Sequence, residues 1–211
     1  MDASFWHQRW ELGEIAFHEG EANSLLVKHF GLLNLAKGSR VFVPLCGKTQ
    51  DIPWLLTQGY EVVGVELSEI AVKELFASLG IVPAISNVGS LIHYQGRNID
   101  IFVGDIFDVT TGLIQPVDAI YDRAALVALP EDMRNQYTAH LINITMAAPQ
   151  LIICFEYDQS VMPGPPFSVN AEEVMRHYES AYSWSLVESR EVAGGLKGKA
   201  DASEMVWVLT N

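Results

Sequence analysis

The chain has 211 residues, which is long enough for one α/β domain with a substantial core. Hydrophobic residues make up 49% and charged residues 18%, a balance that excludes a disordered chain. The formal net charge of −13 argues against a nucleic acid or an anionic membrane surface as a partner, because both bind to basic surfaces.

The sequence also argues against a signal peptide, a membrane-spanning segment and disulfide bonds. The segment Met1–Trp6 has neither the basic region nor the apolar run of a signal peptide, and the apolar stretch Ile144–Phe155 is too short to span a bilayer. The cysteines, Cys46 and Cys154, fall in or beside apolar segments and are typical of reduced, buried thiols. We therefore expect a cytoplasmic protein. The six histidines show no metal-ligand spacing, so no metal site is expected.

The first 21 residues are rich in aromatic side chains, namely Phe5, Trp6, Trp10, Phe17 and His18. Two interpretations fit this segment. It is either a lid that folds over a ligand or an aromatic-anchored helix that covers a sheet.

Strands and helices then alternate along the chain. Strands are predicted at Arg40–Val43, Glu61–Glu66, Ile99–Val103, Ala119–Asp122, Leu151–Glu156, Trp184–Val192 and Glu204–Thr210. Helices are predicted at Asn23–Phe30, Asp51–Gln58, Ser68–Leu79, Pro130–Met146 and Ala171–Tyr178, with Asn23 and Ser68 as N-caps and Pro130 in a first turn. Residues 82–96 read as irregular, with a short strand at Leu91–Tyr94.

This order predicts an α/β fold with a mostly parallel, doubly wound sheet and an antiparallel last strand, the pattern of the class I methyltransferase (Rossmann-like) sheet. We expect a single domain over 1–211, with an N-terminal lid and helix in 1–35 and the sheet core in 36–211.

The most informative spacing joins the ends of two strands. Gly47 follows the strand that begins at Arg40, and Glu66 ends the next strand 19 residues later (66 − 47 = 19). In open α/β sheets ligands bind at the carboxyl ends of the strands, where an acid at this distance accepts hydrogen bonds from ribose hydroxyls. The sequence therefore predicts a nucleoside-containing cofactor, although a solvated Glu66 at a structural strand end would have the same spacing.

The turn between these strands narrows the choice of cofactor. A dinucleotide pyrophosphate favours several glycines at a helix N-terminus, whereas Pro44–Lys48 contains one glycine, Gly47. This favours a nucleoside without phosphate, such as S-adenosylmethionine. Cys46 lies in the same turn, and a nucleophilic cysteine is the minor alternative there.

Five motifs together resemble the thiopurine S-methyltransferase family, in its bacterial branch. They are Val41-Phe-Val-Pro-Leu-Cys-Gly-Lys48, Val63-Gly-Val-Glu-Leu-Ser68, Ile106-Phe-Asp108, Tyr121-Asp-Arg-Ala-Ala-Leu126 and Pro163-Gly-Pro-Pro-Phe167. Trp6, Trp10 and Ala16-Phe-His18 match the family's N-terminal lid, and the resemblance runs from Trp6 to about Leu209. Each motif is weak alone, but the combination is specific.

On the cofactor side, the resemblance implies that Glu66 accepts from the ribose hydroxyls of S-adenosylmethionine. The Leu45 backbone would meet the amino-acid end, and Gly47 would let the main chain come close. Asp105 and Ile106 would hold the adenine, with the Ile106 backbone the stronger assignment. Trp10, and with it Trp6, would cover the cofactor, since an aromatic face suits a sulfonium cation.

On the acceptor side, the resemblance implies that Arg123 touches the reacting sulfur and its cofactor. Arginine stays protonated and cannot act as a base, so its role would be to favour the nucleophilic thiolate. Phe17, Pro165, Pro166 and Phe167 would form an apolar slot for a flat thiol, and His18 is a weaker polar contact. Structural alternatives are an Arg123 ion pair with Asp105, Asp118 or Asp122, and ordinary packing of the aromatic residues.

The expected function is therefore methyl transfer from S-adenosyl-L-methionine to thiopurines and other aromatic or heterocyclic thiols, with selenium or tellurium compounds as further acceptors. The expected partner is a small-molecule thiol, and the family resemblance suggests a monomer. Two alternatives stay open at this point. One is a non-catalytic sensor of S-adenosylmethionine, and the other is a nicotinamide-dependent oxidoreductase, which the single-glycine turn disfavours.

Overall fold

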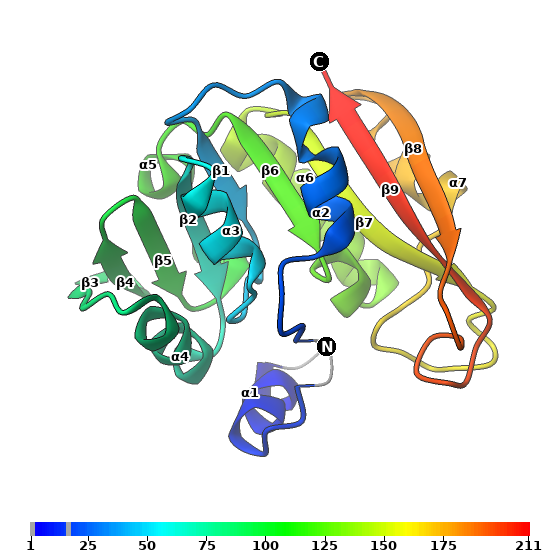
Figure 1. Ribbon diagram of the computed structural model, residues 1–211, viewed down its shortest axis with the longest axis horizontal. Helices are drawn as coiled ribbons and strands as arrows, with labels where there is room; N and C mark the ends of the chain where they lie inside the picture. The colour runs from blue at the N-terminus through cyan, green and yellow to red at the C-terminus, as the bar shows by residue number, and fades with distance from the viewer. Residues whose placement is uncertain (1–2, 16–17) are drawn as a thin grey trace. The chain divides into compact units, whose positions relative to one another are not determined.

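The computed structural model describes residues 3–15 and 18–211. The chain separates into two compact units, Met1–Ile120 and Tyr121–Asn211, and strand β6 (Ala119–Arg123) contributes residues to both. The expectation of one domain over the whole chain stays a prediction. Figure 1 follows the chain by colour from α1 to β9.

The first unit contains a mixed sheet with the strand order β3-β4-β5-β2-β1, continued by the start of β6. Its strands are β1 (Arg40–Val43), β2 (Glu61–Glu66), β3 (Ala84–Val88), β4 (Leu91–Gly96) and β5 (Ile99–Val103). Its helices are α1 (Ala3–Glu11), α2 (Ser24–His29), η1 (Phe30–Leu33), α3 (Asp51–Thr57), α4 (Glu69–Leu79), η2 (Ile106–Asp108) and α5 (Thr111–Ile114). Strands β1, β2 and β5 are parallel and almost continuously buried, as expected when helices cover a parallel sheet.

The amino ends of these parallel strands are joined by one arginine. Arg40 on β1 bonds to Asp100 on β5 at 2.8 Å and lies 3.4 Å from the carboxylate of Glu61 on β2. His93 on β4 lies 2.8 Å from the other Asp100 oxygen. These bonds hold four strands together near the amino ends of β1, β2 and β5. The carboxyl ends of these strands lie on the opposite side, where ligands bind in open α/β sheets.

Residues 84–96 correct the sequence prediction. They form an antiparallel hairpin, β3 and β4, where the sequence indicated irregular chain with one short strand. No side chain of β3 is buried, so no alternation of apolar and polar residues marked it. The turn at Gly89, which has φ +61°, lies between Val88 and its partner Leu91 and is the signal that indicates a hairpin.

The second unit contains the end of β6 followed in strand order by β7, β9 and β8. These strands are β7 (Gln150–Tyr157), β8 (Ser183–Glu191) and β9 (Ala202–Thr210), and the helices are η3 (Leu126–Ala128), α6 (Glu131–Thr145) and α7 (Ala171–Tyr178). The last strand, β9, is antiparallel to both of its neighbours, which confirms the predicted antiparallel last strand.

The observed helices begin close to the predicted residues, but not every predicted capping bond is formed. Asn23 caps α2, as predicted, by accepting from the N–H groups of Leu25 and Leu26. Ser68 precedes α4, as predicted, but its side chain makes no capping bond. Pro130 was expected inside the first turn of α6 and instead stands at the N-cap, in extended conformation, because the helix begins at Glu131.

Candidate active site

The Glu66 carboxylate lies at the carboxyl end of β2 and is buried, with 6% of the residue exposed. Its Oε2 accepts from the Gly47 N–H at 2.7 Å, and its Oε1 accepts from the Ser68 N–H at 2.8 Å. Burial raises the pKa of Glu66, and the N–H groups of Ser68 and Gly47 oppose this. Each carboxylate oxygen offers two acceptor positions, so the described bonds leave capacity for hydroxyl donors.

The turn beside Glu66 has an unusual backbone. Leu45 has φ +45° and Gly47 has φ +53°, both in the left-handed region. Glycine takes this conformation readily, whereas a leucine there is strained, and such strain gathers at functional sites. The turn bound by Glu66 therefore has a specific conformation, which places its main-chain N–H and C=O groups at the carboxyl ends of β1 and β2.

Trp10 on α1 covers this turn. The residue is 6% exposed, and a Cβ added to Gly47 would lie 3.1 Å from the Cζ2 atom of the indole. The Lys48 ammonium lies 6.0 Å from the centroid of the same ring. The structure therefore brings Trp10, Gly47 and Glu66 together, an arrangement that fits both a lid over a ligand and a helix that covers the sheet.

The other predicted lid residues differ in placement. Trp6 is half-buried and packs edge-on against Phe5, with 5.2 Å between ring centroids. His18 is half-buried, and its N–H donates to the Ile15 carbonyl. Phe17 lies outside the described residues.

Asp105 and Ile106 follow β5, which pairs in parallel with β2, so they lie at the same sheet edge as Glu66. The Asp105 side chain is exposed, and its Oδ1 accepts from the Phe107 N–H at 3.0 Å as the cap of η2. Ile106 is buried. One Asp105 oxygen is thus already used by the fold, and the adenine contacts expected of Asp105 and Ile106 stay a prediction.

Cys46 is a buried thiol in the turn beside Glu66. The residue is 6% exposed, and its sulfur would lie 3.1 Å from a Cβ placed on Gly64. Burial raises the pKa of the Cys46 thiol well above its usual value, and the Glu66 carboxylate raises it further. The thiol therefore stays protonated at neutral pH and packs within the sheet.

Arg123 belongs to the second unit, at the end of β6. The next residue, Ala124, has φ +65°, so the chain turns sharply directly after the arginine. Asp122 is fully buried, with its Oδ1 accepting from the Leu126 N–H at 3.1 Å and its Oδ2 accepting from the Tyr137 hydroxyl at 2.7 Å. These bonds fix the turn that carries Arg123.

Asp122 makes the stability of the protein depend on pH. Burial raises its pKa to about 6, against the lowering effect of the Tyr137 and Leu126 donors. A raised carboxyl pKa favours the protonated fold, so this contribution is full below the unfolded pKa of about 4 and is lost as pH rises through about 6. We expect the free energy of unfolding to fall by about 2 kcal/mol more in the wild type than in Asp122→Asn between pH 4 and 7, measured by urea denaturation. Parallel curves for the two proteins would contradict this.

The predicted acceptor slot, Pro165, Pro166 and Phe167, also lies in the second unit and is half-buried. Tyr157 donates its hydroxyl to the Pro166 carbonyl at 2.7 Å, and Lys197 donates to the Pro165 carbonyl at 2.8 Å. Two loops, at 162–167 and 194–200, are thereby joined around Tyr157 and its small apolar cluster.

The roles of two buried charged residues, Asp122 and Arg134, were not predicted from the sequence. Asp122 was considered only as an ion-pair partner for Arg123, although an acid inside the apolar run of β6 is itself a signal of a buried carboxylate. Arg134 on α6 was not singled out, because a single arginine in a helical pattern reads as a solvated side chain.

Within residues 3–15 and 18–211, no group of three or more His, Cys, Asp or Glu side chains could hold a metal ion. Among the same residues no helix has the length and apolar character needed to cross a bilayer.

Comparison with known proteins adds a family to this geometry. The family model described as Thiopurine S-methyltransferase (TPMT) matches residues 1–210. A thiopurine S-methyltransferase of Xanthobacter autotrophicus is 54% identical over 210 residues, covering 99% of both chains. One from Teredinibacter turnerae is 52% identical, covering 100% of this chain and 98% of its own.

Solved structures share the fold at low sequence identity. The Burkholderia thailandensis 1,6-didemethyltoxoflavin-N1-methyltransferase, solved with bound 1,6-didemethyltoxoflavin and S-adenosylhomocysteine, aligns with a TM-score of 0.65 at 17% identity, covering 99% of this chain and 87% of its own. An S-adenosylmethionine-dependent methyltransferase from Methanosarcina mazei aligns with a TM-score of 0.63 at 10% identity, over 90% and 98%. This likeness confirms the predicted class I methyltransferase sheet.

Proposed function

Because the chain belongs to the thiopurine S-methyltransferase family, whose cofactor is S-adenosyl-L-methionine, we propose that it methylates the sulfur of thiopurines and of other aromatic or heterocyclic thiols. The observation that carries the proposal is the family match over residues 1–210. The family match also argues against a nicotinamide-dependent oxidoreductase, since members of this family transfer a methyl group and not a hydride. Cytoplasmic location and a monomeric state stay predictions.

The residues of the first unit fit the cofactor by their chemistry. Glu66 would accept from the ribose hydroxyls, because its buried carboxylate keeps acceptor capacity beyond the Gly47 and Ser68 bonds. The strained turn at Leu45 would present main-chain groups to the amino-acid end of the cofactor, and Ile106 would hold the adenine. Trp10 would cover the site and offer an aromatic face to a cation.

The residues of the second unit would serve the acceptor. Arg123 would place a permanent positive charge beside the acceptor sulfur, lowering the thiol pKa and raising the fraction of thiolate. Phe167, Pro165 and Pro166 would hold a flat ring by apolar contact. Phe17, which lies outside the described residues, is assigned to the acceptor by the family resemblance alone.

These roles give a simple division of labour. When bound, S-adenosylmethionine supplies an already activated methyl group, so the donor needs no further activation by the protein. The residues need to hold the acceptor in line, favour its thiolate and exclude water. A permissive apolar slot would also accept selenium or tellurium analogues of aromatic thiols.

The test is transfer of a labelled methyl group from S-adenosylmethionine to 6-mercaptopurine, followed by the corresponding aromatic selenol. We expect saturable formation of the S-methyl product and competitive inhibition by S-adenosylhomocysteine. Tight S-adenosylhomocysteine binding in calorimetry without turnover of any aromatic thiol would contradict the proposed acceptor. That outcome would favour the sensor hypothesis, in which cofactor binding leads to no reaction.

A further inference from the structure

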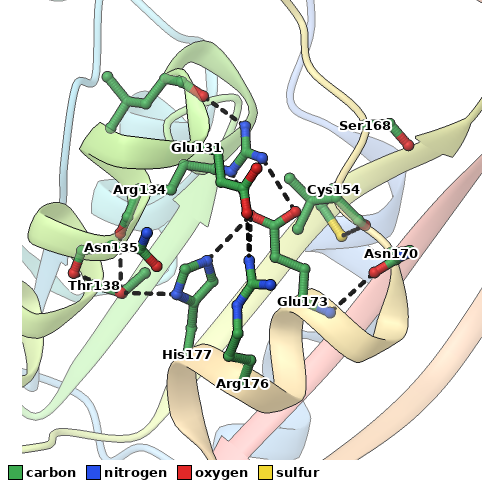
Figure 2. A network of polar contacts seen from close by, with 12 residues as sticks. Glu131, Arg134, Asn135, Thr138, Cys154, Ser168, Asn170, Glu173, Arg176 and His177 are labelled. Atoms are coloured by element: carbon green, nitrogen blue, oxygen red, sulfur yellow. Dashed lines mark hydrogen bonds and ion pairs between the residues drawn. The ribbon is translucent and has the colours of Figure 1, made fainter. Parts of the chain in front are cut away.

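Helices α6 and α7 share a buried ion pair in the second unit (Figure 2). Arg134 is 4% exposed and binds the Glu173 carboxylate through two bonds, from Nε at 2.6 Å and from Nη2 at 3.1 Å. His177 Nε2 lies 3.1 Å from Glu173 Oε1. Burial tends to raise the pKa of Glu173, but bonds from His177 and Arg134 outweigh it and lower the pKa overall. Glu173 is therefore a carboxylate that compensates the buried arginine.

Arg134 also contacts two groups outside this ion pair. Its Nη1 donates to the Leu129 carbonyl at 2.7 Å, and Leu129 ends the segment that begins at Arg123. Its guanidinium carbon lies 5.8 Å from the centroid of the Phe167 ring. One buried cation thus contacts both the segment that follows Arg123 and the aromatic residue of the acceptor slot.

Phe167 is held from further sides. Its N–H donates to the Val127 carbonyl at 2.6 Å, which joins the Phe167 loop to the same segment after Arg123. A Cβ added to Gly164 would lie 2.7 Å from Cδ1 of the ring, so the glycine backbone packs closely against it. The position of the ring therefore depends on Val127, Gly164 and Arg134 together.

We propose that Arg134 is a positioning residue for the thiol acceptor, holding the Phe167 ring and the segment after Arg123 in one fixed arrangement. The inference rests on the proposed function, in which Phe167 and Arg123 serve the acceptor. An ion pair that only stabilised the fold would need Glu173 alone, and apolar side chains often replace such pairs without loss of stability. The contacts to Leu129 and Phe167 are what a positioning role requires.

The experiment compares Arg134→Met and Arg134→Lys with a matched control, Arg176→Met. Arg176 belongs to the same network, 3.0 Å from Glu131 and 3.8 Å from Glu173, but its side chain is 55% exposed. We expect Arg134→Met to lower kcat/KM for 6-mercaptopurine about tenfold to a hundredfold, with the KM for S-adenosylmethionine unchanged. Arg134→Lys should recover part of this loss, because lysine keeps the charge but not the bidentate geometry. Arg176→Met should match the wild type.

A second measurement separates positioning from plain stability. Substituting Phe167→Leu in the wild type and in Arg134→Met forms a double-mutant cycle, and non-additive losses in acceptor kcat/KM are expected if Arg134 acts through the ring. The loss should be smaller for a small aliphatic thiol than for 6-mercaptopurine. A lowered melting temperature with unchanged kinetic constants, or strictly additive losses, would overturn the proposal. A wild type inactive on every thiol would instead contradict the proposed function itself.

Discussion

Arg123→Ala is expected to lower the turnover of 6-mercaptopurine about a hundredfold while leaving S-adenosylhomocysteine affinity nearly unchanged. The reason is electrostatic, since a hydrogen bond from a charged donor to the acceptor thiolate is worth about 1.5–3 kcal/mol, which favours ionisation of the thiol by one to two orders of magnitude. Steady-state methyl transfer gives the first quantity, and calorimetry with S-adenosylhomocysteine gives the second.

A series of aromatic thiols with different acidities sharpens this test. An acidic thiol is ionised without help, so the loss in Arg123→Ala should shrink as the thiol pKa falls and as the assay pH rises. Arg123→Lys keeps the charge and should retain part of the activity. Equal losses for all thiols would instead indicate a structural role, and so would loss of cofactor binding or of folding.

Glu66→Ala is expected to weaken cofactor binding by one to two orders of magnitude, on the order of 1.5–3 kcal/mol for lost charge-assisted hydrogen bonds. The same change leaves the Gly47 and Ser68 N–H groups without their carboxylate acceptor, so a lower melting temperature should accompany it. Calorimetric titration with S-adenosylhomocysteine measures the first effect. Glu61→Ala is the matched control, because Glu61 lies at the opposite end of the same strand.

Analogues that lack a ribose hydroxyl assign the lost affinity. Wild-type protein should bind 2′-deoxy or 3′-deoxy S-adenosylhomocysteine less tightly than the parent compound, whereas Glu66→Ala should hardly distinguish them. If both proteins discriminate equally, Glu66 shapes the turn but does not accept from the ribose.

Sequence reasoning was strongest where burial and chain connectivity agree. The strands Arg40–Val43, Glu61–Glu66 and Ile99–Val103 were predicted with their observed bounds, because parallel strands buried on both faces form short apolar runs between turns. The exposed strand β3 lacks that signal, and it was missed. The spacing of Gly47 and Glu66 predicted a nucleoside-containing cofactor at the strand ends, and the structure adds a direct bond between the two residues that the sequence did not predict.

Side-chain contacts between different helices and loops could not be predicted from the sequence. The contact between Arg134 and Phe167 joins residues far apart in the chain. Helical periodicity in the sequence does not show that the Arg134 side chain turns inward. The two bonds to Asp122 likewise depend on the sharp turn at Ala124, a conformation that alanine does not signal. The roles assigned to the site residues stay predictions until the variants are measured.

The bonds from the Gly47 and Ser68 N–H groups to Glu66 also bear on the thermodynamics of cofactor binding. They fix the Glu66 rotamer and the strained turn at Leu45 through the fold itself, so the conformational entropy of this part of the site is lost during folding and not during association. Little of the binding energy is then needed to organise the ribose contact proposed for Glu66. Because Trp10 covers this turn, we expect cofactor exchange to require movement of α1, and we expect shortening of the proposed lid to speed association and dissociation together.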